Sequence, residues 1–194
     1  IRDKLVTGVQ TCALPISGIV RRIDDLGRVV VPKEIRRTLR IREGDSLEIY
    51  TDREGEIILK KYSPMAEMKE LAKQYVDTLA QNAGGVVAVT DRDQVIAVSS
   101  GGKKELFQKP ISKELEQTMT ERSKVTATQD SKKYVSVTEE KNKYSCEIIY
   151  PIIAAGDVIG SVVLLSRNDE KKFGTTEEAL VAFSANFLGK QMED

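Results

Sequence analysis

The chain lacks histidine and contains only two cysteines, Cys12 and Cys146, among its 194 residues. Histidine is the commonest general base and transition-metal ligand, so its absence excludes Ser-His-Asp, Cys-His and histidine-zinc chemistry. Two cysteines cannot build the disulfide framework of a small secreted domain, which favours a reducing compartment. A carboxylate- or lysine-based enzyme stays open, but no nucleophile–base pair points to one. We therefore predict a protein that is not an enzyme and that has no metal site and no cofactor.

Long apolar runs are also missing. No stretch approaches the roughly 18 apolar residues that a membrane-spanning helix needs, so we expect no membrane partner. The hydrophobic content of 40% is nevertheless enough for packed cores. The length suits one large domain or two small ones.

The first seventeen residues do not resemble a native start. They contain no initiator Met, and residues 6–16 resemble the in-frame translation of a common sequencing-library adapter. A signal peptide is the alternative, but Thr7, Gln10 and Thr11 interrupt the apolar core that such a signal requires. We expect residues 1–17 to be a non-native leader.

Charge is sorted along the chain although it balances overall. Residues 21–42 hold eight basic and three acidic side chains, whereas residues 43–62 hold three basic and six acidic ones. A basic patch concentrated on a small β-rich unit is typical of proteins that bind a phosphate backbone. Alternatively, the basic segment is an ordinary solvent-exposed charged surface on a module that binds protein.

Residues 18–62 are predicted to form a β-β-α-β-β module. Gly27 suits a turn because glycine adopts positive φ, and Pro32 suits the first position of a helix. The predicted strands are 18–23, 28–31, 46–51 and 56–62, with a helix at 33–40. A module of this size without disulfide or metal usually needs a partner copy, so we expect an obligate dimer with one shared core.

The motifs of this module resemble a known family. Asp-Leu-Gly-Arg-Val-Val-Val-Pro at 25–32 and Arg-Arg-Thr-Leu at 36–39 resemble the AbrB-type swapped-hairpin DNA-binding domain of transition-state and sporulation regulators. The resemblance continues more loosely through 91–93 to 187–193. It implies an α+β protein whose N-terminal part is an interlaced, dimeric β-barrel that docks on double-stranded DNA. The implied contacts are Arg21, Arg28, Arg36 and Arg37, then Arg22, with Lys33 and Arg40 as neighbours.

Residues 63–83 are predicted to form a connecting helix. Met65, Met68, Ala72, Tyr75 and Leu79 are spaced 3-4-3-4, as in a coiled-coil seam. Either the helix packs on its own domain, or it pairs two chains and couples the domains. We expect the pairing role, because the barrel already brings two chains together.

Residues 84–194 are predicted to form an α+β sensor domain. The predicted strands are 86–90, 94–99, 134–138, 145–153 and 158–165, and the predicted helices are 111–122 and 176–192. This order resembles a GAF domain, which implies a cup that can hold an unidentified small ligand. Cys146 is expected to be a buried structural thiol rather than a redox sensor. Ser100-Gly-Gly102 resembles a phosphate loop only superficially.

These observations predict a DNA-binding transcription regulator. The resemblance implies a cytoplasmic, nucleoid-associated bacterial protein that acts in sporulation as activator and repressor of forespore genes. The GAF-like domain would adjust its DNA affinity. Two pairing modules per chain favour a homotetramer over a homodimer. The alternative function is an antitoxin-like module that binds protein through the same barrel, but about 130 residues of patterned sequence after the barrel argue against it.

Overall fold

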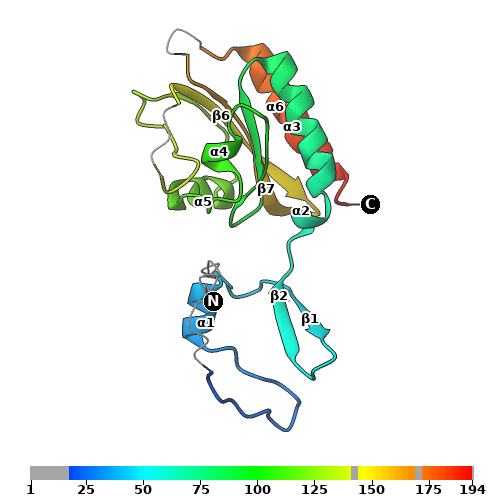
Figure 1. The fold of residues 1–194 in the computed structure, drawn as a ribbon. Coiled ribbons are helices and arrows are strands. Elements are labelled where there is room, and N and C mark those ends of the chain that lie inside the picture. Colours follow the sequence, from blue (N-terminus) through cyan, green and yellow to red (C-terminus); the bar gives the residue numbers. More distant parts are fainter. Residues whose placement is uncertain (1–17, 141–143, 169–171, 194) are drawn as a thin grey trace, which may run out of the picture. The chain divides into compact units, whose positions relative to one another are not determined.

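The computed structural model describes residues 18–140, 144–168 and 172–193. The predicted leader at 1–17, with Cys12, lies outside these residues. The fold is α+β, as predicted, and the chain divides into two compact units, residues 1–44 and residues 45–194 (Figure 1). The domain boundary predicted at residue 62 stays a prediction.

The described part of the first unit contains one helix, α1 (Lys33–Thr38), and no strand. The strands predicted at 18–23 and 28–31 are therefore wrong for the single chain. Both segments are exposed along nearly their whole length, and apart from the turn bond from Asp24 N–H to Arg28 O at 3.1 Å, the described residues show no backbone pairing for them. A strand needs a neighbour for its N–H and C=O groups, and the part of the chain that the structure describes offers no neighbouring strand for these two segments.

The second unit begins with a hairpin of strands β1 (Leu47–Thr51) and β2 (Ile57–Lys61). They pair antiparallel, with Ile49 opposite Leu59. At the turn, Asp52 Oδ1 accepts hydrogen bonds from the backbone N–H groups of Glu54 at 3.0 Å and Glu56 at 2.8 Å. The hairpin is an open two-stranded sheet, and residues 18–62 of the single chain do not close a barrel.

A five-stranded antiparallel sheet forms the centre of the second unit. Its strands are β3 (Val86–Thr90), β4 (Val95–Val98), β5 (Val125–Thr128), β6 (Cys146–Ala154) and β7 (Asp157–Ser166). Their order is β4-β3-β7-β6-β5, so β4 and β5 are the edges. The hydrophobic runs of β6 and β7 lie inside the sheet, where side chains are buried on both faces.

Helices cover both faces of this sheet (Figure 1). The helices α3 (Lys69–Ala83) and α6 (Thr175–Lys190) pack on one face, over a core that includes Val76, Ile148 and Leu188. The short helices α4 (Lys103–Leu106) and α5 (Lys113–Thr120) lie with the second core, which includes Leu115 and Ile149.

Two details of this domain differ from the prediction. Residues 134–138 form no regular strand; Ile111 and Thr138 share only an isolated bridge, and the edge strand is instead β5. Helix α4 was not predicted. It follows Gly102, where a Cβ atom would lie 2.4 Å from Val86 Cγ1, so close packing rather than phosphate binding accounts for this glycine.

The predicted connecting helix belongs to the sensor domain. It consists of α2 (Pro64–Glu67) and α3, and Met65, Ala72 and Leu79 of the predicted seam are buried in the domain's own core. Tyr75 stacks on Phe187 of α6, with ring centroids 5.6 Å apart. The helix therefore packs on its own domain, and those seam residues do not face a second chain.

Cys146 is 2% exposed at the start of β6, in agreement with the predicted buried thiol. In the described part of the chain, no helix has the length and apolar character that a bilayer span requires.

Candidate nucleic-acid interface

A tight turn positions Arg28. Asp24 Oδ1 accepts the backbone N–H of Leu26 at 3.1 Å and that of Arg28 at 2.7 Å, and Gly27 adopts a φ of 76°. Arg28 Nε donates to Asp24 Oδ2 at 2.7 Å, and this bond fixes the Nε end of the guanidinium group. These bonds from Arg28 lower the pKa of Asp24. The Arg28 side chain stays 69% exposed, so its guanidinium can still reach an outside acceptor.

Helix α1 carries Arg36 and Arg37 in its last turn. The helix starts after Pro32 and ends in a Schellman arrangement. The N–H of Ile41 bonds to Arg36 O at 2.7 Å, the N–H of Arg40 bonds to Arg37 O at 3.3 Å, and Arg40 has a φ of 52°. The cap ends α1 at Thr38, two residues earlier than predicted.

The five predicted DNA contacts, Arg21, Arg22, Arg28, Arg36 and Arg37, are all exposed. The first three flank the Asp24 turn, and the last two lie on α1. Within the described residues, no hydrogen bond or ion pair links these two groups. Lys33 is also exposed, and Arg40 is half-buried. The single chain therefore presents the arginines to solvent, and their use as a DNA surface stays a prediction.

Large apolar side chains of this module are uncovered. In the first unit, Val20 is 92% exposed and Val30 is 73% exposed. On the hairpin, Ile49 and its cross-strand partner Leu59 lie on one face and are also exposed. Helix α1 buries no residue. Monomeric proteins rarely leave so much apolar surface in water, so this surface is typical of a chain lacking a partner.

A contact that the sequence did not reveal ties the hairpin to the sensor domain. Lys61 Nζ, at the end of β2, lies 2.9 Å from Asp45 Oδ2 and 2.6 Å from Asp93 Oδ2 in the turn between β3 and β4. The Lys61 side chain is 18% exposed, so the pairs are largely shielded from water. Residues 91–93 connect two of the predicted strands, but nothing in the sequence indicates that Asp93 meets Lys61.

The neighbouring carboxylate Asp91 reinforces this contact. Ser63 Oγ donates to Asp91 Oδ2 at 3.2 Å, and Asp91 Oδ1 accepts the N–H groups of Asp93 and Gln94, both at 2.7 Å. Burial raises the pKa of Asp91. We call Lys61, Ser63, Asp91 and Asp93, with Asp45, the hairpin latch.

The cysteine and carboxylate side chains do not suggest a metal site. Among the residues that the structure describes, no group of three or more cysteine or carboxylate side chains is arranged to hold an ion.

Two family models match the chain. Residues 67–193 match "Stage V sporulation protein T C-terminal, transcription factor", and residues 20–67 match "Antidote-toxin recognition MazE, bacterial antitoxin". The first match covers the sensor domain, and the second covers the predicted DNA-binding module.

Similar proteins cover most of the chain. Stage V sporulation protein T of Bacillus subtilis is 52% identical over 180 residues, which are 91% of this chain and 98% of that protein. The transition state regulatory protein AbrB of Bacillus subtilis is 48% identical over 83 residues, or 42% of this chain and 84% of that protein. These likenesses confirm the predicted AbrB-type N-terminal domain.

The sensor domain has the GAF fold, as predicted. The GAF domain of an Acinetobacter phosphoenolpyruvate-protein phosphotransferase superposes with a TM-score of 0.54 at 11% identity, covering 69% of this chain and 84% of that one. At this identity the likeness concerns the fold alone. The near full-length relative and the family model together show that the chain belongs to the stage V sporulation protein T family of transcription factors, and so is a sporulation regulator rather than an enzyme.

Proposed function

We propose that the N-terminal module binds double-stranded DNA as an interlaced homodimer and thereby activates and represses forespore genes in the cytoplasm. The observation that carries the proposal is the exposure of Arg21, Arg22, Arg28, Arg36 and Arg37 in the basic segment. Guanidinium groups suit phosphate oxygens and guanine edges. The Asp24 turn orders the side chain of Arg28 and leaves it exposed to solvent.

The same module supports the dimer. The segments 18–23 and 28–31 have β-branched residues but no pairing partner, and the hairpin has an uncovered apolar face. A second copy would offer both the missing strand neighbours and the missing apolar contacts. Interlacing would also double the number of arginines on one surface.

DNA binding is tested by fluorescence anisotropy with a labelled duplex at several salt concentrations. Two copies of the four arginines with the strongest resemblance, Arg21, Arg28, Arg36 and Arg37, would neutralise about six to eight phosphates, giving a slope of log affinity against log salt of about −5 to −7. The variant Arg28→Ala/Arg36→Ala removes four cations from the dimer and should make that slope shallower by about 3 to 4.

The matched control is Arg53→Ala/Lys104→Ala, which removes the same charge from an exposed hairpin turn and from α4. It should keep the slope of the parent. If both double variants made the salt slope equally shallow, net charge alone would explain the effect, and the proposed arginine contacts would be contradicted.

We infer that the sensor domain adjusts DNA affinity through the hairpin latch. Lys61 belongs to the DNA-binding module by sequence, and Asp93 belongs to the sensor domain. A ligand that favours one arrangement of the β3–β4 turn would change the contacts of Lys61, and coupling requires such a difference between two states. A ligand that stabilises the protein yet leaves the DNA affinity unchanged would contradict this role.

The antitoxin-like alternative is favoured by one observation, the match of residues 20–67 to an antitoxin family. In that case the barrel would bind a protein. A toxin gene beside the native gene, together with no salt-sensitive retention of duplex DNA, would decide for the alternative.

A further inference from the structure

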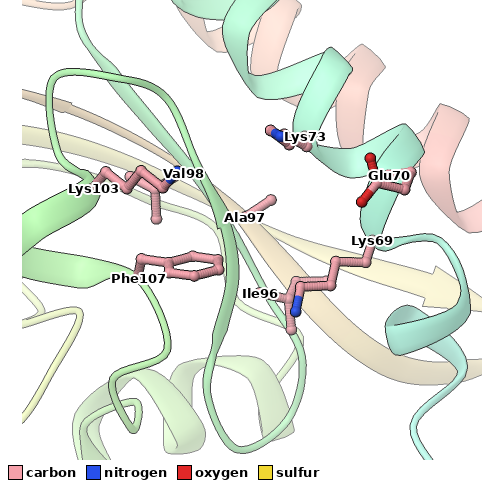
Figure 2. Close-up of a pocket in the computed structure, with 8 residues that line it drawn as sticks. All are labelled: Lys69, Glu70, Lys73, Ile96, Ala97, Val98, Lys103 and Phe107. Carbon is pink, nitrogen blue, oxygen red and sulfur yellow. The ribbon is translucent and has the colours of Figure 1, made fainter.

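A pocket lies beside the edge strand β4, with residues of α3 on one side and residues of α4 on the other. It has a volume of about 190 Å³ and is lined by Lys69, Glu70, Lys73, Ile96, Ala97, Val98, Lys103 and Phe107. Figure 2 shows Lys69, Glu70 and Lys73 coming from α3 on one side, and Lys103 and Phe107 on the other. At about 30 Å³ per water molecule, the volume equals roughly six waters, so it suits a metabolite smaller than a typical drug.

The floor of the pocket is apolar. Ile96, Ala97 and Val98 are almost completely buried in β4, and Phe107 is half-buried and packs against the second core. β4 is the last strand of the sheet; Val95 bonds to the backbone of Gln108 and Lys109, and no further named strand pairs with this edge in the described structure. A planar or short aliphatic group could lie against Phe107 and the strand.

The rim of the pocket is positively charged. It carries three lysines and one carboxylate. The ammonium groups of Lys69 and Lys103 lie 5.6 Å and 5.7 Å from the Phe107 ring centroid. Within the described residues, no ion pair engages Lys69, Lys73 or Lys103. Several cations beside one ring repel one another, so an anion placed among them would gain from each.

We propose that this pocket binds a small organic anion, with a carboxylate or phosphate group on Lys69, Lys73 and Lys103 and an apolar body against Phe107 and Ile96. Lys69 and Lys73 are four residues apart, so they lie on one side of α3 and can hold the same anionic group. The site lies at the edge of β4, between residues of α3 and residues of α4, and it does not depend on the proposed DNA contacts.

The proposal is tested by calorimetric titration of the full chain without DNA. The probes are benzoate and phenyl phosphate, which combine charge with a ring, benzamide, which is uncharged, and inorganic phosphate, which has no apolar body. We expect saturable binding of benzoate or phenyl phosphate, and the tighter of the two identifies the preferred anionic group. Benzamide and inorganic phosphate should each bind at least about tenfold more weakly.

Two variants assign the binding to this pocket. Lys69→Gln/Lys73→Gln should weaken the tighter anion at least about tenfold, whereas Lys132→Gln/Lys133→Gln, which removes two exposed lysines elsewhere, should leave it unchanged. Three results would overturn the proposal. The first is no saturable binding of benzoate or phenyl phosphate up to roughly 10 mM. The others are benzamide or inorganic phosphate binding as tightly as both ring-bearing anions, or an equal loss of anion affinity in the two double variants.

Discussion

Gly189 marks the closest approach of α6 to the sheet. A Cβ atom at this position would lie 2.2 Å from the backbone carbonyl oxygen of Ile153 in β6. This carbonyl belongs to backbone that pairs with Val158 of β7, so it cannot move aside as cheaply as a flexible side chain. The small residue is therefore needed for packing although it lies in a helix, where glycine is otherwise unfavourable.

The variant Gly189→Ala should lower the free energy of unfolding by about 1–3 kcal/mol, because the clash outweighs the better helix propensity of alanine. Urea denaturation measures this change. Gly101→Ala is the control, since its Cβ would meet only a movable methyl group of Val86 at 3.3 Å. A Gly189→Ala protein as stable as its parent would contradict the packing argument.

Glu147 is a buried carboxyl group near the start of β6. It is 0% exposed; Oε1 accepts the N–H of Val135 at 2.6 Å, and Oε2 has no hydrogen-bond partner within the described residues. Burial raises the pKa of Glu147 to about 8. The folded state therefore holds a proton that the unfolded chain releases above its ordinary carboxyl pKa of 4.5.

This proton makes stability fall as pH rises. The contribution of Glu147 is complete below about pH 4.5 and declines until about pH 8, by at most about 1.4 kcal/mol per pH unit. Glu147→Gln stays neutral at every pH, so its unfolding free energy should fall less than that of the parent between pH 5.5 and pH 8. Urea denaturation at both values measures the difference. The variant Glu54→Gln, at an exposed site, should show the same pH dependence of unfolding free energy as the parent. If Glu147→Gln also kept the parent's pH dependence, the assignment of Glu147 as a buried neutral acid would be contradicted.

At the scale of elements, the hairpin latch is the feature that links β1 and β2 to the sensor domain. Lys61 meets two carboxylates, and the Asp45 side chain is only 7% exposed. Removing one partner of a shielded charge pair leaves the other charge without compensation.

We expect Lys61→Met to cost about 1–3 kcal/mol, less than a fully buried pair because Asp93 is partly exposed. Hydrogen exchange of the hairpin amides should also become faster. The neighbouring variant Lys60→Met removes an exposed lysine and should change neither quantity appreciably. Combining Lys61→Met with Asp93→Asn should be less harmful than the sum of the single changes; strict additivity would show that the two side chains do not interact.

At the scale of the whole molecule, we propose that α3 and α6 form a second pairing surface. Phe183 is 65% exposed and stacks on Phe187, which in turn stacks on Tyr75. A row of partly exposed aromatic rings on a domain surface is typical of a protein–protein contact. Together with the proposed N-terminal dimer, this surface supports a homotetramer.

Phe183→Ser should therefore reduce the tetramer to a dimer in light-scattering measurements of molar mass, while DNA binding by each dimer persists. Lys132→Ser, which changes an exposed side chain outside α3, α6 and the N-terminal module, is the control. A Phe183→Ser protein that stays tetrameric would place the second contact elsewhere.

The amino-acid sequence by itself determined the α+β class, the family and most elements of the sensor domain. The apolar runs of β6 and β7 predict buried strands, and the periodic apolar face of α6 predicts a helix. Both patterns can be read from the spacing of apolar residues along the chain. The exposed arginines were also identifiable, since a charge cluster with glycine and proline at turn positions is local information.

Tertiary structure decided the features that depend on which distant residues meet. The seam of residues 65–79 is compatible with two partners, and only the packed sheet showed that it faces its own core. Likewise, the contact of Lys61 with Asp93 and the pocket beside β4 bring together residues far apart in sequence. The segments 18–23 and 28–31 show the converse: β-branched residues favour strands, but a strand forms only where another backbone completes its hydrogen bonds.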